Sequence, residues 1–224
     1  MSFHILKNPA LKNQVAVIQD KNTDTERYRT TLDNIGLFMA YEISDLLSKE
    51  QRFVETNFGK IKGIKIKDED VIFIAILRAA VPMMIGAIKV FPHAQCGMIS
   101  ARRVLVTEGN GKDCAQFNVP IEYSNVPEIT KKSILILPDP ALASGSSVVT
   151  VLKKLLGVLV PKKIIILSVV CAKEGVNNIL KNYPKAEIFT AHLGKGLNEK
   201  GFIVPDGPGD AGDRSFGFGN GEHV

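Results

Sequence analysis

Short apolar runs alternate with amphipathic segments through the middle of this 224-residue chain, and this alternation constrains its fold most. The clearest run, Val71–Leu77, is continuously apolar and rich in β-branched residues, which predicts a strand buried on both faces. Further strands are predicted at Gly97–Ser100, Ser133–Leu137, Lys163–Val170 and Glu187–Ala191, and helices at Pro82–Val90, Ser146–Leu156 and Gly175–Asn182. We therefore expect an α/β fold with an open, mostly parallel twisted sheet flanked by helices.

Other segments lie outside this alternation. An amphipathic helix is predicted at Glu26–Ser48, and Phe53–Ile66 is predicted to be a β-hairpin. The tail after Lys195 is rich in Gly, Pro and Asp, so little regular structure is expected there. We expect a single domain over residues 1–224, with a small hood over the sheet formed by about residues 51–67 and 192–214.

The composition is that of an ordinary globular protein, with 45% hydrophobic and 23% charged residues. The net charge of +5 comes from scattered lysines, which do not form a basic arm for nucleic acid. The three cysteines make no disulfide framework, the apolar runs are too short to cross a bilayer, and the first residues do not resemble a signal peptide. We expect a cytoplasmic protein that binds neither nucleic acid nor membrane.

One segment combines a strand end, an acid and a serine-rich helix start. Asp139 follows the strand Ser133–Leu137, and Ala143–Ser147 leads into the next helix. A helix N-terminus suits a phosphate, Gly145 allows a close backbone approach, and the carboxylate of Asp139 can accept hydrogen bonds from sugar hydroxyls. Taken alone, an ordinary helix N-cap is the more common explanation of such a segment.

Arginines follow two of the predicted strands. Arg78 comes directly after Val71–Leu77, and Arg102 and Arg103 come after the next strand. The carboxyl edge of a parallel sheet is where ligands bind, and a guanidinium fork can bind a diphosphate bidentately. A surface arginine is the commoner explanation for either site alone, but two such sites favour a ligand. The long polar stretch from Arg103 to Val119 is either a lid or a solvated loop.

The tail and the histidines exclude other kinds of site. Gly207, Gly209 and Gly212 have the spacing of a dinucleotide-binding motif, but Pro208 and the lack of a strand–turn–helix context exclude that interpretation. The four histidines lack the spacing of metal ligands, so no direct protein metal site is expected.

Taken together, these segments resemble the uracil phosphoribosyltransferase family along most of the chain. Ile76–Ala79 is similar to the family's pyrophosphate loop, Arg103 to its second diphosphate-binding arginine, and Asp139–Gly145 to its phosphoribosyl diphosphate loop. The N-terminal match is Asp20–Thr23 with Arg29, and the most specific match is the C-terminal string of Asn198–Pro205 and Gly209–Arg214.

The resemblance implies a type I phosphoribosyltransferase fold and transfer of the phosphoribosyl group from 5-phosphoribosyl 1-diphosphate to uracil, giving UMP and diphosphate. It implies that the sugar phosphate is held by Asp139, Ala143, Ser144, Gly145, Ser146 and Ser147, and that the catalytic residues are Arg78, Arg103 and Asp210. Main-chain groups would bind uracil at Ile203, Gly209, Asp210 and Ala211. Mg²⁺ would act through the diphosphate and waters near Asp210, and a homo-oligomer, either dimer or tetramer, is implied.

The chain departs from the family pattern at several places. Ala80 and Pro82 replace glycines of the pyrophosphate loop, Gly194 replaces an aspartate, and Gln19 replaces an arginine. The uracil loop, Val204–Gly209, is one residue longer than the family's. Two alternatives therefore stay open: a relative that binds UMP or phosphoribosyl diphosphate without turnover, and a transferase that acts on a different base.

Overall fold

A computed structural model gives the structure of this chain, described for residues 2–101, 104–107 and 116–217. Within these residues a seven-stranded sheet has the order β1-β11-β10-β9-β4-β5-β8. Its strands are β1 (Phe3–Ile5), β4 (Val71–Leu77), β5 (Gln95–Ala101), β8 (Ile121–Asn125), β9 (Ile134–Leu142), β10 (Lys163–Cys171) and β11 (Glu187–Leu193). Only β8, at one edge, is antiparallel to its neighbour, so the predicted open, mostly parallel sheet is confirmed.

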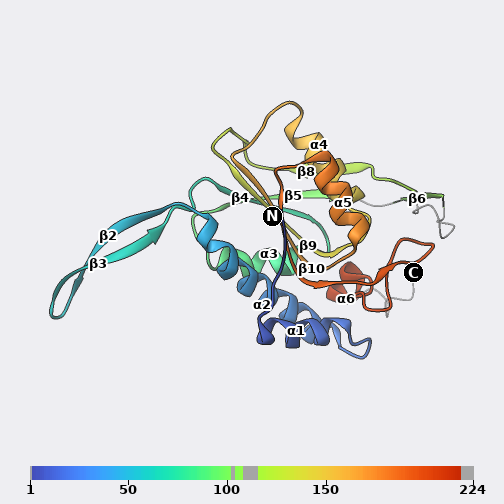
Figure 1. Ribbon diagram of the computed structural model, residues 1–224, viewed down its shortest axis with the longest axis horizontal. Coiled ribbons are helices and arrows are strands. Elements are labelled where there is room, and N and C mark those ends of the chain that lie inside the picture. The colour runs from blue at the N-terminus through green and yellow to red at the C-terminus, as the bar shows by residue number, and fades with distance from the viewer. Residues whose placement is uncertain (1, 102–103, 108–115, 218–224) are drawn as a thin grey trace.

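Helices cover both faces of this sheet (Figure 1). One face carries α1 (Pro9–Gln19), α2 (Thr25–Ile43) and α3 (Val81–Ile88), and the other carries α4 (Ser146–Leu156) and α5 (Lys173–Asn182). Consecutive residues of β4 divide between the two layers: Phe73 packs in the cluster with α1–α3, whereas Ile72 and Ile74 pack in the cluster with α4 and α5. Burial on both faces explains why β4 is continuously apolar.

The boundaries differ from the sequence predictions at informative places. The helix predicted at Glu26–Ser48 ends at Ile43 and continues as a 3₁₀ turn over Ser44–Leu46, and α1 and β1 were not predicted. The strand predicted to end at Leu137 continues to Leu142 through two prolines, and Asp139 lies within it. Pairing of β9 with β4 stops at Ile136, while pairing with β10 continues to Leu142. The prolines therefore lie where β9 has one neighbouring strand, which tolerates their missing N–H groups.

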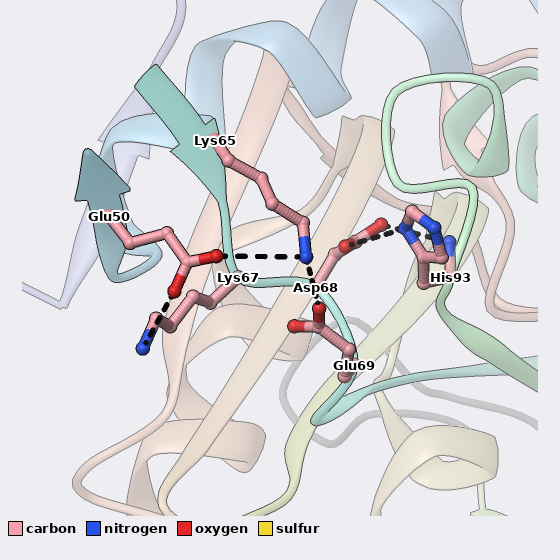
Figure 2. Close-up of polar contacts among 6 residues, drawn as sticks. All are labelled: Glu50, Lys65, Lys67, Asp68, Glu69 and His93. Carbon is pink, nitrogen blue, oxygen red and sulfur yellow. Dashed lines mark hydrogen bonds and ion pairs between the residues drawn. The ribbon is translucent and has the colours of Figure 1, made fainter. Parts of the chain in front are cut away.

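The predicted hairpin is β2 (Lys49–Thr56) paired with β3 (Gly59–Ile66), and it projects from one end of the molecule (Figure 1). At the base of the hairpin, the ammonium group of Lys65 forms ion pairs with Glu50 and Glu69 (Figure 2). Beside them, the carboxylate of Asp68 accepts a hydrogen bond from the main-chain N–H of His93 and contacts the His93 ring. The C-terminal segment with α6 lies toward the other end of the molecule (Figure 1). The two segments that we expected to form one hood are therefore separated in space in this single chain.

The tail has more regular structure than its composition predicted. It contains a two-stranded ribbon of β12 (Gly196–Leu197) and β13 (Ile203–Val204), followed by α6 (Ala211–Phe216). The carboxylate of Asp210 accepts a hydrogen bond from the N–H of Asp213 and so provides the N-cap that begins α6. A second short ribbon pairs β6 (Val104–Thr107) with β7 (Gln116–Asn118). Within the described part of the chain, each helix is too short or too polar to cross a membrane.

Candidate active site

A cavity of about 1020 Å³ opens where β4 and β9 separate at their carboxyl ends. Ligands bind in such crevices of open α/β sheets. All the predicted site residues that the structure describes line this one cavity: Arg78, Asp139, Ala143, Ser144, Gly145, Ser146, Ser147, Ile203, Gly209, Asp210 and Ala211. Arg103 lies outside the described residues, as does most of the predicted lid. The cavity therefore unites segments from the middle and the end of the chain.

The serine-rich turn forms one wall of the cavity, which we call the phosphate wall (Asp139–Ser147). Gly145 is the residue before α4 and has a φ of 73°, a conformation that glycine adopts without strain. The Ser144 hydroxyl donates to the Ser146 hydroxyl at 3.0 Å. Glycine at the N-cap has no side chain to cap α4, and the N–H of Ser146 donates to the Ser144 hydroxyl at 3.4 Å. The N–H groups at the start of α4 and the serine hydroxyls are suited to an anion.

Helix α5 supports this wall from behind. A Cβ atom on Gly145 would lie 2.9 Å from the carbonyl oxygen of Gly175, and a Cβ on Gly175 would lie 2.4 Å from the carbonyl oxygen of Ala143. The side-chain amide of Asn178 donates to the carbonyl oxygen of Ser144 at 2.9 Å. Two glycines and one amide thus fix the turn against the start of α5.

Arg78 lies on the opposite side of the cavity, in the turn between β4 and α3. Its guanidinium forms an ion pair with Asp213 of α6, with Nη2 and Oδ1 2.7 Å apart. The arginine side chain is 46% exposed, and Arg78 lines the cavity. The turn is close-packed against the tail, since a Cβ on Gly212 would lie 3.3 Å from Asp210 Oδ1 and 3.9 Å from the amide of Ala79.

The tail forms the third side, which we call the base wall (Ile203–Asp213). Its start is fixed by the pairing of Ile203 with Leu197, and Ile203 is buried. Gly209 has a φ of 72°, which favours glycine. A Cβ on Gly207 would lie only 2.2 Å from the carbonyl oxygen of Ile203, so the loop folds tightly on itself.

Residues near the N-terminus hold the base wall in place. The buried hydroxyl of Tyr28 donates to the carbonyl oxygen of Pro208 at 3.1 Å, and burial raises the pKa of this tyrosine, which keeps its proton in place. The guanidinium of Arg214 lies 4.2 Å from the centre of the Tyr28 ring. It also donates to the carbonyl oxygens of Ile18, Asp20, Thr23 and Pro208. These contacts connect the two ends of the chain.

Sequence reasoning assigned no role to several of these residues. Asp213 and Arg214 lie within the C-terminal string that resembles the family, so that resemblance could have identified both as site residues. Tyr28 lies beside the N-terminal match but carried no signal of its own. The cavity is also lined by Ser100, Glu122, Lys200 and Phe202, of which Glu122 and Ser100 had no sequence signal.

The fold is that of the phosphoribosyltransferases. An adenine phosphoribosyltransferase from Trypanosoma brucei superposes on 91% of this chain, and 89% of that chain is covered, with a TM-score of 0.52 at 10% identity, a likeness of fold alone. A protein from Aquifex aeolicus is far more similar, with a TM-score of 0.85 and 30% identity over 96% of this chain and 98% of that one.

The sequence comparisons narrow this class to one family. The family model for uracil phosphoribosyltransferase matches residues 5–218, so the chain belongs to the uracil phosphoribosyltransferase family. Uracil phosphoribosyltransferase from Thermococcus gammatolerans is 41% identical over 94% of this chain and 90% of its own length. The protein of that name from Thermococcus sibiricus is 39% identical over 94% of this chain and 87% of its own length.

Proposed function

We propose that this chain transfers the phosphoribosyl group of 5-phosphoribosyl 1-diphosphate to uracil, giving UMP and diphosphate. The observation that carries the proposal is the convergence of a phosphate wall, an arginine turn and a base wall on one cavity. Membership of the uracil phosphoribosyltransferase family supports the same reaction.

The phosphate wall would bind the 5′-phosphate. The hydroxyls of Ser144, Ser146 and Ser147 and the first N–H groups of α4 provide neutral donors, and the α4 dipole adds a partial positive charge. Asp139 lies beside them on β9, where its carboxylate would accept hydrogen bonds from the ribose hydroxyls. The sugar would therefore be held at its phosphate and at its hydroxyls, with C1 directed toward the arginine turn.

Departure of the diphosphate would be promoted by charge. In the reaction the bond between ribose C1 and the diphosphate oxygen breaks, uracil N1 bonds to C1, and the N1 proton is released. We propose that Arg78 binds the departing diphosphate, together with Arg103, and that Asp210 acts beside it. Removing one preorganised group of this kind costs about 10²–10³ in turnover in other enzymes. The Arg78–Asp213 ion pair holds the guanidinium at the cavity before substrate arrives.

The acids around the cavity fit a magnesium diphosphate. Asp139, Asp210, Asp213 and Glu122 line it, and carboxylate oxygens are suitable ligands for Mg²⁺ and its waters. Within the described residues, His, Cys, Asp and Glu side chains form no group of three or more able to hold a metal. We propose that Mg²⁺ binds through the diphosphate and through waters near Asp210. When bound, it neutralises charge on the leaving group.

Main-chain groups of the base wall would recognise uracil through hydrogen bonds. Ile203, Gly209 and Ala211 lie along the cavity, and a main-chain donor beside an acceptor complements the edge of uracil. A base with the opposite arrangement of donors and acceptors would leave buried polar groups of the base wall unpaired. The base wall would therefore favour uracil over such a base.

The changed pyrophosphate loop is compatible with this activity. Ala80 has φ −75° and ψ −15°, and Pro82 lies in the first turn of α3. In the described part of the chain, all residues with positive φ are glycines, so neither Ala80 nor Pro82 has a backbone conformation that requires glycine.

We also propose that the chain forms a homo-oligomer, a dimer or tetramer, in the cytoplasm. The hairpin supports self-association, because Phe53, Phe58, Ile61 and Ile64 are exposed on it. Light scattering coupled to size exclusion would measure the mass. A monomer at micromolar concentration would contradict this part of the proposal.

Turnover tests the proposed function. The protein is incubated with uracil, 5-phosphoribosyl 1-diphosphate and Mg²⁺, and UMP and diphosphate are measured. We expect equal amounts of both products. Cytosine, orotate, hypoxanthine and adenine form the comparison panel, and faster turnover of one of these bases would overturn uracil as the substrate. Nucleotide binding without product would overturn the enzymatic role.

A further inference from the structure

The extended uracil loop contains a carboxylate that is tied to the central sheet. Oδ2 of Asp206 lies 2.7 Å from Nε2 of His192, which stands at the end of β11. Oδ1 of Asp206 accepts a hydrogen bond from the N–H of Lys195 at 3.2 Å. The main-chain oxygen of Asp206 accepts a further one from the side-chain amide of Gln19 at 2.6 Å. Two different parts of the chain, the end of α1 and the end of β11 with the residues after it, thus hold one loop residue.

A glycine lies beside both this carboxylate and the base wall. A Cβ on Gly194 would lie 3.4 Å from Asp206 Oδ1 and 2.5 Å from Cγ2 of Ile203. A side chain at position 194 would therefore press on Ile203, a residue of the base wall, and would only touch the Asp206 carboxylate. Three departures from the family pattern therefore meet here: Gly194, Gln19 and the longer loop.

The two halves of the loop are anchored separately. Pro208, in the second half, receives hydrogen bonds from Tyr28 and Arg214. The first half, next to Ile203, contains Asp206 and its contact with His192. Burial of Asp206 opposes its ionisation, but hydrogen bonds from His192 and the Lys195 N–H outweigh that effect, so the pKa of this carboxyl is lowered. The loop thus carries a charged group at this anchor.

We propose that Asp206 and His192 form a latch that positions the Ile203 main chain for reading uracil, an inference that rests on the proposed function. Neither side chain is among the described residues that line the cavity, so both act through the loop. The latch sets the affinity for the base and its discrimination. It leaves the phosphate wall, which belongs to β9 and α4, unchanged.

A double-mutant cycle tests the latch. Asp206→Ala and His192→Ala are each expected to raise KM for uracil about tenfold, the effect of losing one hydrogen bond to a charged carboxylate. KM for 5-phosphoribosyl 1-diphosphate is expected to stay within about twofold, a split that a general loss of structure does not give. Both variants break the contact between His192 and Asp206, and Asp206→Ala also removes the acceptor of the Lys195 N–H. The double variant is therefore expected to match Asp206→Ala. Multiplied single effects, or equal changes in both KM values, would overturn the proposal.

His93→Ala is the matched control. His93 contacts Asp68 at 3.1 Å in the cluster at the base of the hairpin (Figure 2), so this variant removes a histidine–aspartate contact far from the loop. We expect both KM values to remain as in the unmodified chain. His192→Gln retains a side-chain donor and is expected to recover part of the uracil affinity lost in His192→Ala; no recovery would count against the latch.

Hydrogen exchange separates failure of the latch from failure of the proposed function. Without any substrate, Asp206→Ala is expected to accelerate amide exchange at residues 203–207 at least about fivefold, while exchange in α4 and in the His93→Ala control stays unchanged. Unchanged exchange at residues 203–207 would overturn the latch even in an active enzyme. Absence of UMP formation by the unmodified chain would overturn the function and leave this measurement intact.

Discussion

The phosphate wall and the base wall face the same cavity but are built in opposite ways. The phosphate wall is one continuous strand–turn–helix segment, Asp139–Ser147, supported by neighbouring α5. The base wall is held by groups from the other end of the chain, since Tyr28 and Pro208 are 180 positions apart and Arg214 contacts the Ile18 carbonyl across 196. Binding of phosphate thus depends on local structure, and binding of the base on tertiary contacts.

Asp210→Asn tests the junction of the two walls and has the largest expected effect. Asparagine is as good an N-cap as aspartate, so α6 keeps its cap while the negative charge beside the diphosphate is lost. We expect kcat/KM to fall about 100-fold with little change in stability. Asp24→Asn, the same substitution at the N-cap of α2, provides the control and should leave turnover as it was.

Gly145→Ala tests the phosphate wall. The added Cβ would lie 2.9 Å from the Gly175 carbonyl oxygen and would occupy a positive-φ conformation. We expect KM for 5-phosphoribosyl 1-diphosphate to rise at least about tenfold, with KM for uracil less affected. Gly157→Ala shares the positive φ but has no atom within 4 Å of the new Cβ, so it should destabilise the protein without changing KM. Equal kinetic effects of both variants would refute the steric argument.

Arg214→Lys tests the base wall. Lysine cannot reproduce the planar fork that donates to several carbonyl oxygens, nor the same stacking on Tyr28. We expect a loss of about 2 kcal/mol in the free energy of unfolding and a rise of about fivefold in KM for uracil. Denaturant titration and initial rates measure the two quantities. A change confined to KM for 5-phosphoribosyl 1-diphosphate would contradict the claim that Arg214 supports binding of the base.

Asn178→Ala has the smallest expected effect. It removes the hydrogen bond to the Ser144 carbonyl while leaving the glycine contacts behind the turn in place. We expect KM for 5-phosphoribosyl 1-diphosphate to rise about threefold, the size of a single hydrogen bond of modest strength. The exposed neighbour Asn177, changed to alanine, is the control, and a change of the same size there would show that the bond is unimportant.

The same contrast explains what could be predicted from the sequence. The alternation of apolar runs predicted the sheet, and the acid and serines of the phosphate wall stood out because they adjoin one strand and one helix. The base wall was found only through its resemblance to a family, since nothing in local periodicity links Arg214 to Ile18 or Tyr28 to Pro208. The continuation of β9 through its prolines was missed because it depends on where β4 stops pairing with β9.

A crystal structure with UMP bound tests the central claim most directly. The account expects the phosphate within hydrogen-bonding distance of the Ser144–Ser147 donors and the uracil ring against the main chain of Ile203 and Gly209. Arg78 should lie on the side of C1 from which diphosphate departs. A nucleotide that binds with its base at the serine turn, or outside this cavity, would contradict the account.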